Sequence, residues 1–241
     1  TETYRLTDTL NVDVNRQNAK AYCMLKEYKI SVNRYEALKA MGDRSFTTLY
    51  YLGVSQYADN WPYGARDNLL EAHKKNPMDV NVLYYLAKAC ARSSWKEEGI
   101  AYMNKAFDMV VPTDSMMIRL YDGLLECYKF HTKADPYEKI EVMKEAYSYT
   151  KRYTLFYQIA EIYDYQKDYV NAVHYYEKYM ALVPKNKQTA LDSEGNPLPN
   201  ADTMYQKARR RVEKIKVEDF FRNGAHDDYF EPKVIRTQTK K

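Results

Sequence analysis

The residue types that most often carry out catalysis are few in this sequence. Histidine and cysteine act as acid–base groups, nucleophiles and metal ligands. They are His73, His131, His174, His226, Cys23, Cys90 and Cys127. The cysteines lie far apart and the histidines fall in different segments, so neither set has the spacing of a disulfide framework or a zinc site. We therefore predict buried, unpaired cysteines, no metal site and no bound cofactor.

Sequence motifs for the common catalytic and phosphate-binding sites are absent. The sequence has no Walker or dinucleotide-binding loop, no His-Glu-x-x-His, no Gly-x-Ser-x-Gly and no calcium loop. Glu97-Glu98 and Asp227-Asp228 are adjacent carboxylates. Adjacent residues point to different faces of a helix, so these pairs are not placed for acid–base work. The sequence predicts no catalytic residue and a protein that is not an enzyme.

The densest basic cluster is Arg209-Arg210-Arg211 with three nearby lysines, Lys207, Lys214 and Lys216. Glu213 and Glu218 interrupt it, and the whole chain carries 37 basic and 33 acidic residues. A nucleic-acid binder would need its cations to converge on one face, with affinity that falls steeply with salt. We predict a solvated helix face here and no nucleic-acid partner.

Tyrosine is the unusual component of the composition, with 26 of 241 residues. Its ring is apolar and its hydroxyl polar, which suits half-buried helix faces and interfaces. Some tyrosines recur at a fixed interval: Tyr50 and Tyr84 are 34 residues apart. The small residues Ser31, Ala65 and Gly99 have the same spacing. A period of this length indicates a repeated supersecondary unit.

One unit, Phe46 to Asp79, shows the pattern most clearly. Each half carries apolar residues at helical spacing, and the halves meet near Asn60-Trp61-Pro62. Gly53 in the first half and Ala65 in the second are small, so two antiparallel helices can approach closely there. Pro77 ends the unit because proline cannot continue a helix. The sequence therefore predicts helix-turn-helix repeats.

A unit with Leu52-Gly53 early, Ala65 and Ala72 later and Pro77 at its end resembles the tetratricopeptide repeat, TPR, over about residues 12 to 184. The resemblance implies an all-α, TPR-like right-handed α-solenoid of about five repeats. We place the repeats at 12–45, 46–79, 80–114, 115–152 and 153–185. We expect Asp114 or Ser115 to cap the fourth repeat.

Outside the repeats we predict four further segments. Residues 1–11 form an extended lead-in, 186–200 a loop, 201–224 a capping helix and 225–241 a tail. Asp202 or Thr203 caps that last helix, whose apolar residues Tyr205, Ala208 and Val212 cover the open end of the solenoid. Because the chain starts at Thr1 and not at methionine, we expect processing upstream. No apolar run approaches 18 residues, so no membrane span is predicted.

The resemblance also implies a partner-binding site. In TPR proteins the first helices line a concave groove, and the fifth residue of each repeat points into it. Here that residue is Arg16, Tyr50, Tyr84 or Tyr157. Further groove candidates lie one or two turns away: Lys20, Tyr57, Lys88, Glu161 and Asp164. We expect the rings of Tyr50, Tyr84 and Tyr157 to be exposed in one row. The alternative is that these rings fill gaps between repeats.

We therefore predict a non-enzymatic scaffold that binds a protein or peptide segment in the groove. Recognition of a chaperone tail is not expected, because the second repeat offers Tyr50, Tyr51 and Val54 where that family subtype has an asparagine. A glycan-binding helical-repeat protein of the bacterial envelope is the alternative. It would need exposed aromatic rings flanked by amide or carboxylate side chains in one pocket. The tyrosine-rich repeats resemble those of bacterial envelope proteins, which favours the periplasm or cell envelope; the sequence does not indicate an oligomeric state.

Overall fold

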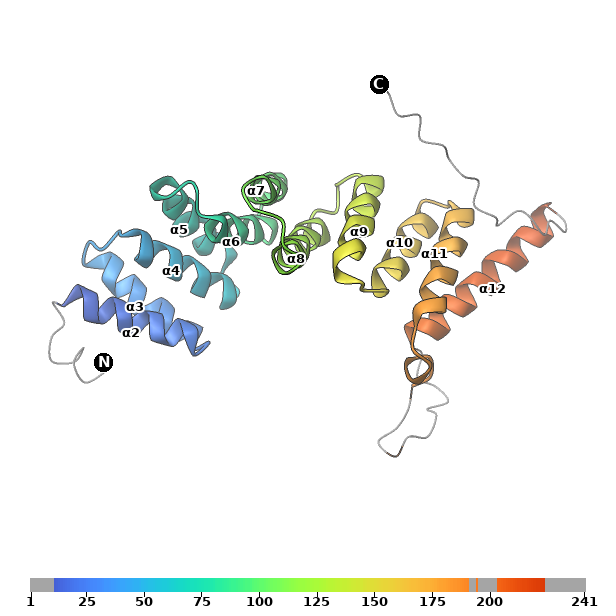
Figure 1. Ribbon diagram of the computed structural model, residues 1–241, viewed down its shortest axis with the longest axis horizontal. Helices are drawn as coiled ribbons and strands as arrows, with labels where there is room; N and C mark the ends of the chain where they lie inside the picture. Colours follow the sequence, from blue (N-terminus) through green and yellow to red (C-terminus); the bar gives the residue numbers. More distant parts are fainter. Residues whose placement is uncertain (1–10, 191–193, 195–202, 224–241) are drawn as a thin grey trace, which may run out of the picture. The chain divides into compact units, whose positions relative to one another are not determined.

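The computed structural model describes residues 11–190, 194 and 203–223, and this part of the chain is helical throughout, with no β-strand (Figure 1). The helices are α2 (Val12–Met24), α3 (Tyr28–Ala40), α4 (Phe46–Ala58), α5 (Pro62–Lys75), α6 (Val80–Ala91), α7 (Lys96–Asp108), α8 (Asp114–Phe130), α9 (Pro136–Thr150), α10 (Thr154–Tyr165), α11 (Tyr169–Leu182) and α12 (Met204–Asn223). A short 3-10 turn spans Lys185–Lys187. The predicted all-α fold, with successive helix pairs and a C-terminal helix, is confirmed.

Most of these helices begin at a side chain that accepts a hydrogen bond from the first turn. Ser45 caps α4, Asp79 caps α6 and Asp168 caps α11. Thr203 accepts a hydrogen bond from the backbone N–H of Gln206, as predicted for the last helix. The fourth repeat differs from the prediction, because Thr113 caps α8 and not Asp114 or Ser115. The threonine hydroxyl reaches the free N–H of Met116 from one residue earlier.

The helices form two compact units. The first unit contains α2 to α8 and ends at Ala134, and the second contains α9 to α12 and starts at Asp135. The boundary falls inside the predicted fourth repeat, 115–152. The first helices of the repeats are α2, α4, α6, α8 and α10, and the second helices are α3, α5, α7, α9 and α11.

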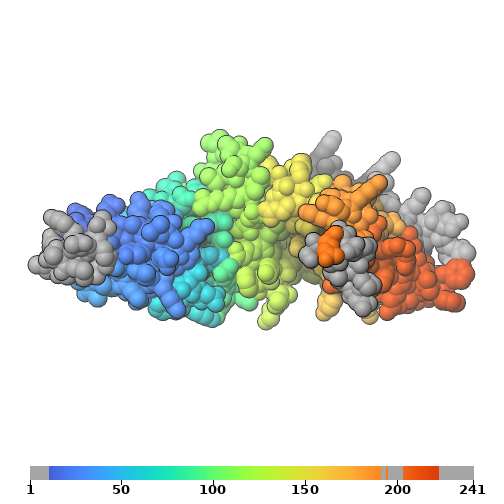
Figure 2. Space-filling view, turned by 90° about the horizontal axis from the view of Figure 1, so that it is seen from below, coloured from blue at the N-terminus to red at the C-terminus, as the bar shows by residue number. Residues whose placement is uncertain are grey.

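The first unit is held together at the small residues that recur along the sequence. A Cβ added to Gly53 would lie 2.5 Å from Leu69 Cγ, and one added to Gly99 would lie 2.8 Å from the carbonyl oxygen of Ala87. Ser31 is fully buried, and its hydroxyl donates to the carbonyl of Ala19 at 3.1 Å. Figure 2 shows the side chains of this unit, from blue to green, closing against one another on the face in view. Close helix approach at this position is therefore confirmed.

The second unit has its own core, to which α12 contributes. Ala208, Val212 and Ile215 of α12 are buried in the same cluster as Tyr176 and Tyr179 of α11. This helix lies beside α11 at the red end of the chain (Figure 1). The helix that follows the repeats thus covers an apolar face of the last pair. The predicted lead-in, the tail and most of the predicted loop fall on residues outside the described part of the chain.

Candidate partner-binding face on the first helices

A row of tyrosine rings crosses the first helices of the first unit. The rings of Tyr50 and Tyr51 in α4 meet edge to face, with centroids 5.0 Å apart. Tyr50 meets Tyr85 of α6 at 6.3 Å, and Tyr85 in turn contacts Tyr84 at 5.2 Å and Tyr57 at 6.2 Å. We call these five residues the tyrosine row. Edge-to-face contacts of this kind are favourable beyond the burial of apolar area, so the rings hold each other in fixed positions.

Cationic side chains lie over this row. The Lys20 ammonium is 5.2 Å from the centroid of the Tyr51 ring, and the Arg119 guanidinium is 4.5 Å from that of Tyr84. Lys88 lies 5.0 Å from Tyr84 and Arg92 lies 4.4 Å from Tyr57. A cation at this distance is attracted by the negative face of the ring. Lys20 is on α2, Lys88 on α6 and Arg119 on α8, and Arg92 directly follows α6. Contacts between cations and tyrosine rings therefore continue from one repeat to the next.

One carboxylate, Glu126 of α8, joins three first helices. It accepts hydrogen bonds from the Tyr57 hydroxyl at 2.5 Å and from Arg92 Nε at 2.7 Å. Its other oxygen pairs with Lys88 Nζ at 3.0 Å. Burial opposes the charged form of Glu126, but the hydrogen bonds from Tyr57 and Lys88 and the charges of Lys88 and Arg92 outweigh it and lower its pKa. The carboxylate therefore remains ionised and fixes Tyr57, Lys88 and Arg92 in place.

Two of the predicted groove residues are less exposed than expected. Tyr84 is 8% exposed and Tyr57 is 7% exposed. The expectation of an exposed ring is therefore wrong for Tyr84. The physical reason is that α8 packs against the ring at Gly123, where an added Cβ would lie 2.8 Å from Tyr84 Cε2. Tyr84 supports the row from beneath, and its half-buried neighbours Tyr50, Tyr51 and Tyr85 supply the accessible area.

Arg16, the candidate in the first repeat, is bound to other residues of the unit. Its guanidinium donates to Asp43 at 3.0 and 3.2 Å and to Asp13 at 2.7 Å. Asp43 also accepts hydrogen bonds from Ser45 and Thr48 at the start of α4. Burial raises the pKa of Asp43, but the hydrogen bonds from Thr48, Ser45 and Arg16 outweigh it and leave the pKa lowered. Arg16 thus links α2 to the beginning of α4, whereas Lys20, one turn later, lies over the row.

The candidates in the second unit form a separate group on α10. The Tyr157 ring meets the rings of Tyr176 and Tyr179 edge to face, at 5.5 and 5.3 Å. Burial, together with the charge of Glu161, raises the pKa of Tyr157 to about 12. Asp164 accepts two hydrogen bonds of 2.6 Å from Arg211 of α12. Asp164 therefore holds the last helix, and its oxygens are already engaged.

The sequence prediction missed part of this face. Tyr51 and Tyr85 occupy the sixth position of their repeats and connect the rings, and Arg92, Arg119 and Glu126 supply the charges. Two signals were available: the dipeptides Tyr50-Tyr51 and Tyr84-Tyr85 are 34 residues apart, and so are Arg92 and Glu126, which have opposite charges. Residues one repeat apart on first helices face each other, so opposite charges at that spacing favour an ion pair.

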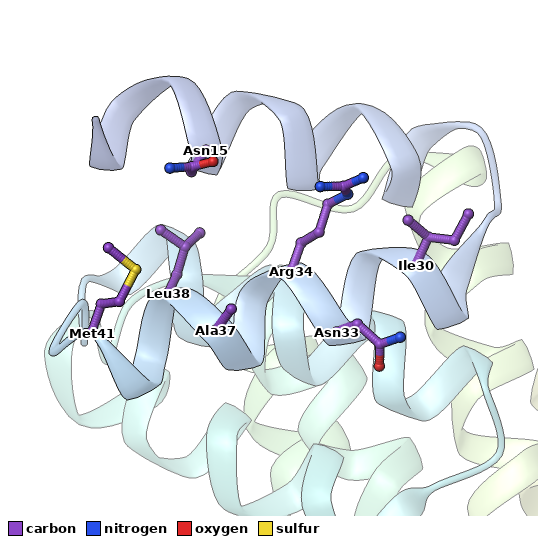
Figure 3. Close-up of a pocket in the computed structure, with 7 residues that line it drawn as sticks. All are labelled: Asn15, Ile30, Asn33, Arg34, Ala37, Leu38 and Met41. Atoms are coloured by element: carbon purple, nitrogen blue, oxygen red, sulfur yellow. The ribbon is translucent and has the colours of Figure 1, made fainter. Parts of the chain in front are cut away.

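The first unit has two hollows on its surface. One hollow of about 440 Å³ lies between α2 and α3, where Asn15 faces Leu38 and Arg34 (Figure 3). Figure 3 shows Arg34 reaching from α3 towards α2, and its guanidinium lies 4.8 Å from the Tyr22 ring. The other hollow, of about 520 Å³, lies between α3 and α5 and contains Trp61.

No group of side chains in the described residues is arranged as a metal site. Cys23, Cys90 and Cys127 are buried free thiols, as predicted, and burial raises the pKa of Cys90 to about 11 and that of Cys127 to about 12. Thiols with raised pKa values are poor nucleophiles at neutral pH. Among the described helices, none is both long and apolar enough to cross a membrane.

Comparisons with known proteins place the fold. No family model matches the sequence, and no curated protein matches it. Solved structures do match. The C-terminal part of a TPR repeat-containing protein from Cytophaga hutchinsonii has a TM-score of 0.64 and 17% identity, over 86% of this chain and 74% of that one. YrrB, described as a TPR protein with an unusual peptide-binding site, has a TM-score of 0.59 and 12% identity, over 76% and 92%.

A third match is MamA, from residue 41 to its end, of Desulfovibrio magneticus RS-1, with a TM-score of 0.58, 12% identity, and 71% of this chain and 94% of that chain covered. At such low identities the likeness concerns the fold and leaves the partner open. Together with the recurring small residues at the helix contacts, it shows that this chain has the tetratricopeptide-repeat fold.

Proposed function

We propose that this protein is a non-enzymatic scaffold that binds an extended protein segment carrying acidic side chains, and that the segment docks on the tyrosine row. The observation that carries the proposal is a row of tyrosine rings on the first helices α4 and α6, with cations held over it from α2, α6, α8 and the residue after α6. The description of YrrB as a TPR protein with a peptide-binding site supports the same class of function.

The chemistry of the face selects the partner. Lys20, Lys88, Arg92 and Arg119 are four cations, and Glu126 is the carboxylate bound among them. Because excess positive charge remains, a partner carboxylate would gain a charge-assisted hydrogen bond. The rings of Tyr50, Tyr51 and Tyr85 offer large contact area, and they lose little freedom on binding because neighbouring rings already hold them.

Engaged side chains limit where the segment can bind. Arg16 and Asp164, both predicted to face the partner, already form ion pairs at 3.0 and 2.6 Å. We therefore assign binding to the middle of the first unit, with Tyr50 and Tyr85 as anchors. We propose binding and not catalysis because the Tyr57 hydroxyl and Glu126, which could act as nucleophile and base, are held in one fixed cluster with Lys88 and Arg92. A location in the bacterial envelope stays a prediction from the sequence alone.

The test is binding of a fluorescently labelled peptide library, divided into acidic, basic and neutral classes and followed by anisotropy. We expect acidic peptides to bind and binding to weaken as salt rises. Replacing both anchors, Tyr50→Ala with Tyr85→Ala, removes two central aromatic contacts. Hot-spot residues of this type contribute about 2 kcal/mol or more each, so losing both should weaken the binding of acidic peptides by about a thousandfold.

The matched control is Tyr137→Ala with Tyr165→Ala, since these rings are 53% and 85% exposed in the second unit. This variant should bind acidic peptides as the unsubstituted protein does. Thermal melts of both variants establish that each is folded. Equal binding by the two double variants would show that the tyrosine row is not the site, and a preference for basic peptides would refute the charge assignment.

A further inference from the structure

The second helices α3 and α5 border a hollow that is separate from the tyrosine row. The hollow there measures about 520 Å³. Leu52 and Gln56 of α4 form its floor, Glu36 and Lys39 of α3 form one wall, and Trp61 stands at the start of α5 on the other. Pockets of this size are large enough for a small ligand with several polar groups.

Trp61 is placed in this hollow as an open aromatic surface. Its side chain is 49% exposed, although tryptophan has the largest apolar surface of any residue. A Cβ added to Gly64 would lie 2.9 to 3.1 Å from three atoms of the indole ring, so the indole lies directly over this glycine. One face of the ring is therefore supported by the backbone of α5, and the ring borders the hollow.

The next repeat contains a matched tryptophan that is covered. Trp95 stands 34 residues after Trp61, also just before a second helix. The Arg66 guanidinium lies 3.7 Å from its ring centroid, and the Tyr63 ring meets it edge to face at 5.9 Å. The residues 34 positions before Arg66 and Tyr63 are Val32 and Lys29. Val32 is buried and too short to cover Trp61. Trp61 therefore remains open, although Trp95 at the same position of the next repeat is covered.

The polar lining of the hollow is fixed before any ligand arrives. Lys39 Nζ donates to Asn68 Oδ1 at 2.7 Å, and Asn68 Nδ2 donates to Gln56 Oε1 at 2.8 Å. Gln56 Nε2 in turn donates to Glu36 Oε1 at 3.3 Å. Gln56 and Asn68 are 2% and 4% exposed, so this chain of hydrogen bonds runs from the protein interior to the hollow. It orients the accessible ends, Lys39 and Glu36.

The charges around Trp61 balance. Glu36 and Asp67 supply carboxylate acceptors, and Lys39 and Arg44 supply donors. Asp67 also pairs with Arg66 and Arg44 with Glu71, so Glu36 and Lys39 are the principal polar groups for a ligand. A ligand with many hydroxyl groups can donate to the first pair and accept from the second without carrying a charge itself. The C–H face of a pyranose ring is attracted to the negative face of an indole. An exposed tryptophan flanked by amide and carboxylate side chains in one pocket is therefore matched by a sugar ring.

We propose that the hollow between α3 and α5 binds a neutral saccharide, with one pyranose ring stacked on Trp61. This site is separate from the tyrosine row, because its residues come from the second helices and, at the floor of the hollow, from Leu52 and Gln56 of α4. Saccharide binding is therefore independent of the peptide binding proposed above, and either can fail without the other.

The experiment uses the full chain with Trp95→Phe, which leaves Trp61 as its only tryptophan and its emission as the reporter. Neutral oligosaccharides built from glucose, galactose, mannose, xylose or N-acetylglucosamine are titrated to millimolar concentrations. We expect a saturable change in Trp61 emission with at least one of these classes. Calorimetry of that oligosaccharide with the unsubstituted chain should give the same affinity, since Trp95 is covered.

Two variants locate the site. Gly64→Ala places a methyl group where the indole now lies and should weaken binding at least tenfold, while the helix of α5 stays intact because alanine is a good helix former. Trp61→Ala should abolish binding in calorimetry, with circular dichroism confirming the fold. The proposal is overturned if no oligosaccharide changes the emission, if Trp61→Ala still binds, or if only nucleosides or peptides, titrated in parallel, produce the change.

Discussion

The first helices of the two units pair with the following helix through charges of opposite sign. In the first unit, Lys88 lies one turn after Tyr84 and pairs with Glu126 of α8. In the second unit, Asp164 lies two turns after Tyr157 and pairs with Arg211 of α12. In the first unit, a cation on the first helix α6 pairs with a carboxylate on the next first helix, α8. In the second unit, a carboxylate on the first helix α10 pairs with a cation on the last helix, α12.

The comparison shows that the helix packed against a repeat position determines how far its side chain is buried and which charge it pairs with. Tyr84 is buried because α8 packs on it, whereas Tyr157 stays half-buried among Tyr176 and Tyr179. α12 is not a repeat, yet its Arg211 binds the first helix α10 as Glu126 binds α6. The charges also separate the units chemically: cations gather over the tyrosine row, and carboxylates gather beside Tyr157. The acidic partner proposed above is therefore expected on the first unit.

Removing α12 should have the largest effect, because it takes away the element that completes the second unit. A chain that ends at Val183 loses the buried side chains of Ala208, Val212 and Ile215. Burying a valine or isoleucine contributes about 1.5–3 kcal/mol each, so we expect the second unit to lose roughly 3–6 kcal/mol of stability. Urea denaturation followed by circular dichroism measures this loss.

The same truncation should expose Tyr176 and Tyr179 and promote association, which light scattering detects. Val217→Ala in the untruncated chain is the matched control, since Val217 is on α12 but 54% exposed. It should leave stability and solution size unchanged. A truncated chain that is monomeric and as stable as the untruncated chain would show that α12 does not complete the core.

Breaking the two ion pairs should have a smaller effect, and a different one in each unit. Glu126→Ala leaves Lys88, Arg92 and the Tyr57 hydroxyl without their shared acceptor, and the Lys88 side chain is only 16% exposed. We expect a loss of about 2–4 kcal/mol, less than for fully buried pairs because solvent still reaches Arg92. Asp164→Ala should cost about 1–2 kcal/mol, because Arg211 is 30% exposed and can turn to water.

Denaturation of both variants in the same buffer makes the comparison, and the ratio of the two losses is the informative quantity. Glu213→Ala is the control, since its pair with Arg209 lies on the surface of α12 and both side chains are more than half exposed. If Asp164→Ala costs more stability than Glu126→Ala, the ion pair between Asp164 and Arg211 of α12 is the stronger of the two. The predicted order of the two losses would then be wrong.

Features set by local periodicity could be predicted from the sequence, and features set by the next helix could not. Ala65 was predicted at a close helix contact, and Ser31 and Gly99 share its position in their repeats; a small residue repeated every 34 positions indicates that two helices approach closely in each repeat. The burial of Tyr84 depends on Gly123 and on the register of α8, and two stripes of apolar residues there, Met117-Leu120-Leu124 and Ile118-Tyr121-Leu125, fit equally well. The structure buries all of the first stripe but only Tyr121 of the second.

Charged partners were harder to predict for the same reason. Tyr57 and Glu126 are 69 residues apart, and only the packing of α4, α6 and α8 brings them to 2.5 Å. Asp164 and Arg211 are separated by 47 residues that include the predicted loop. Trp61 and Trp95 could have been compared from sequence, since they are one repeat apart, but the covering residue Arg66 comes from the helix between them.

Acid should produce the smallest and most specific difference between the units, through two glutamates whose pKa values move in opposite directions. The pKa of Glu126 is lowered from an ordinary value of 4.5, so its carboxylate stabilises the fold fully above that pH. That contribution is lost as the pH falls from about 4.5 through the lower pKa of the folded state. The pKa of Glu161 is raised, mainly by burial, so its contribution has the opposite sign: it is present below about 4.5 and is lost as the pH rises through the folded value.

Glu126→Gln and Glu161→Gln separate these two effects, since glutamine keeps the shape and removes the titration. Stability of each variant is measured by urea denaturation from neutral pH to pH 3. The deficit of Glu126→Gln relative to the unsubstituted protein should shrink as the pH falls below about 4.5, because the unsubstituted carboxylate becomes protonated too. Glu161→Gln should instead be the more stable protein at neutral pH, and that advantage should vanish in acid. Parallel curves for the two variants would contradict the assignment, because they would mean that the pKa values of the two carboxylates do not shift in opposite directions.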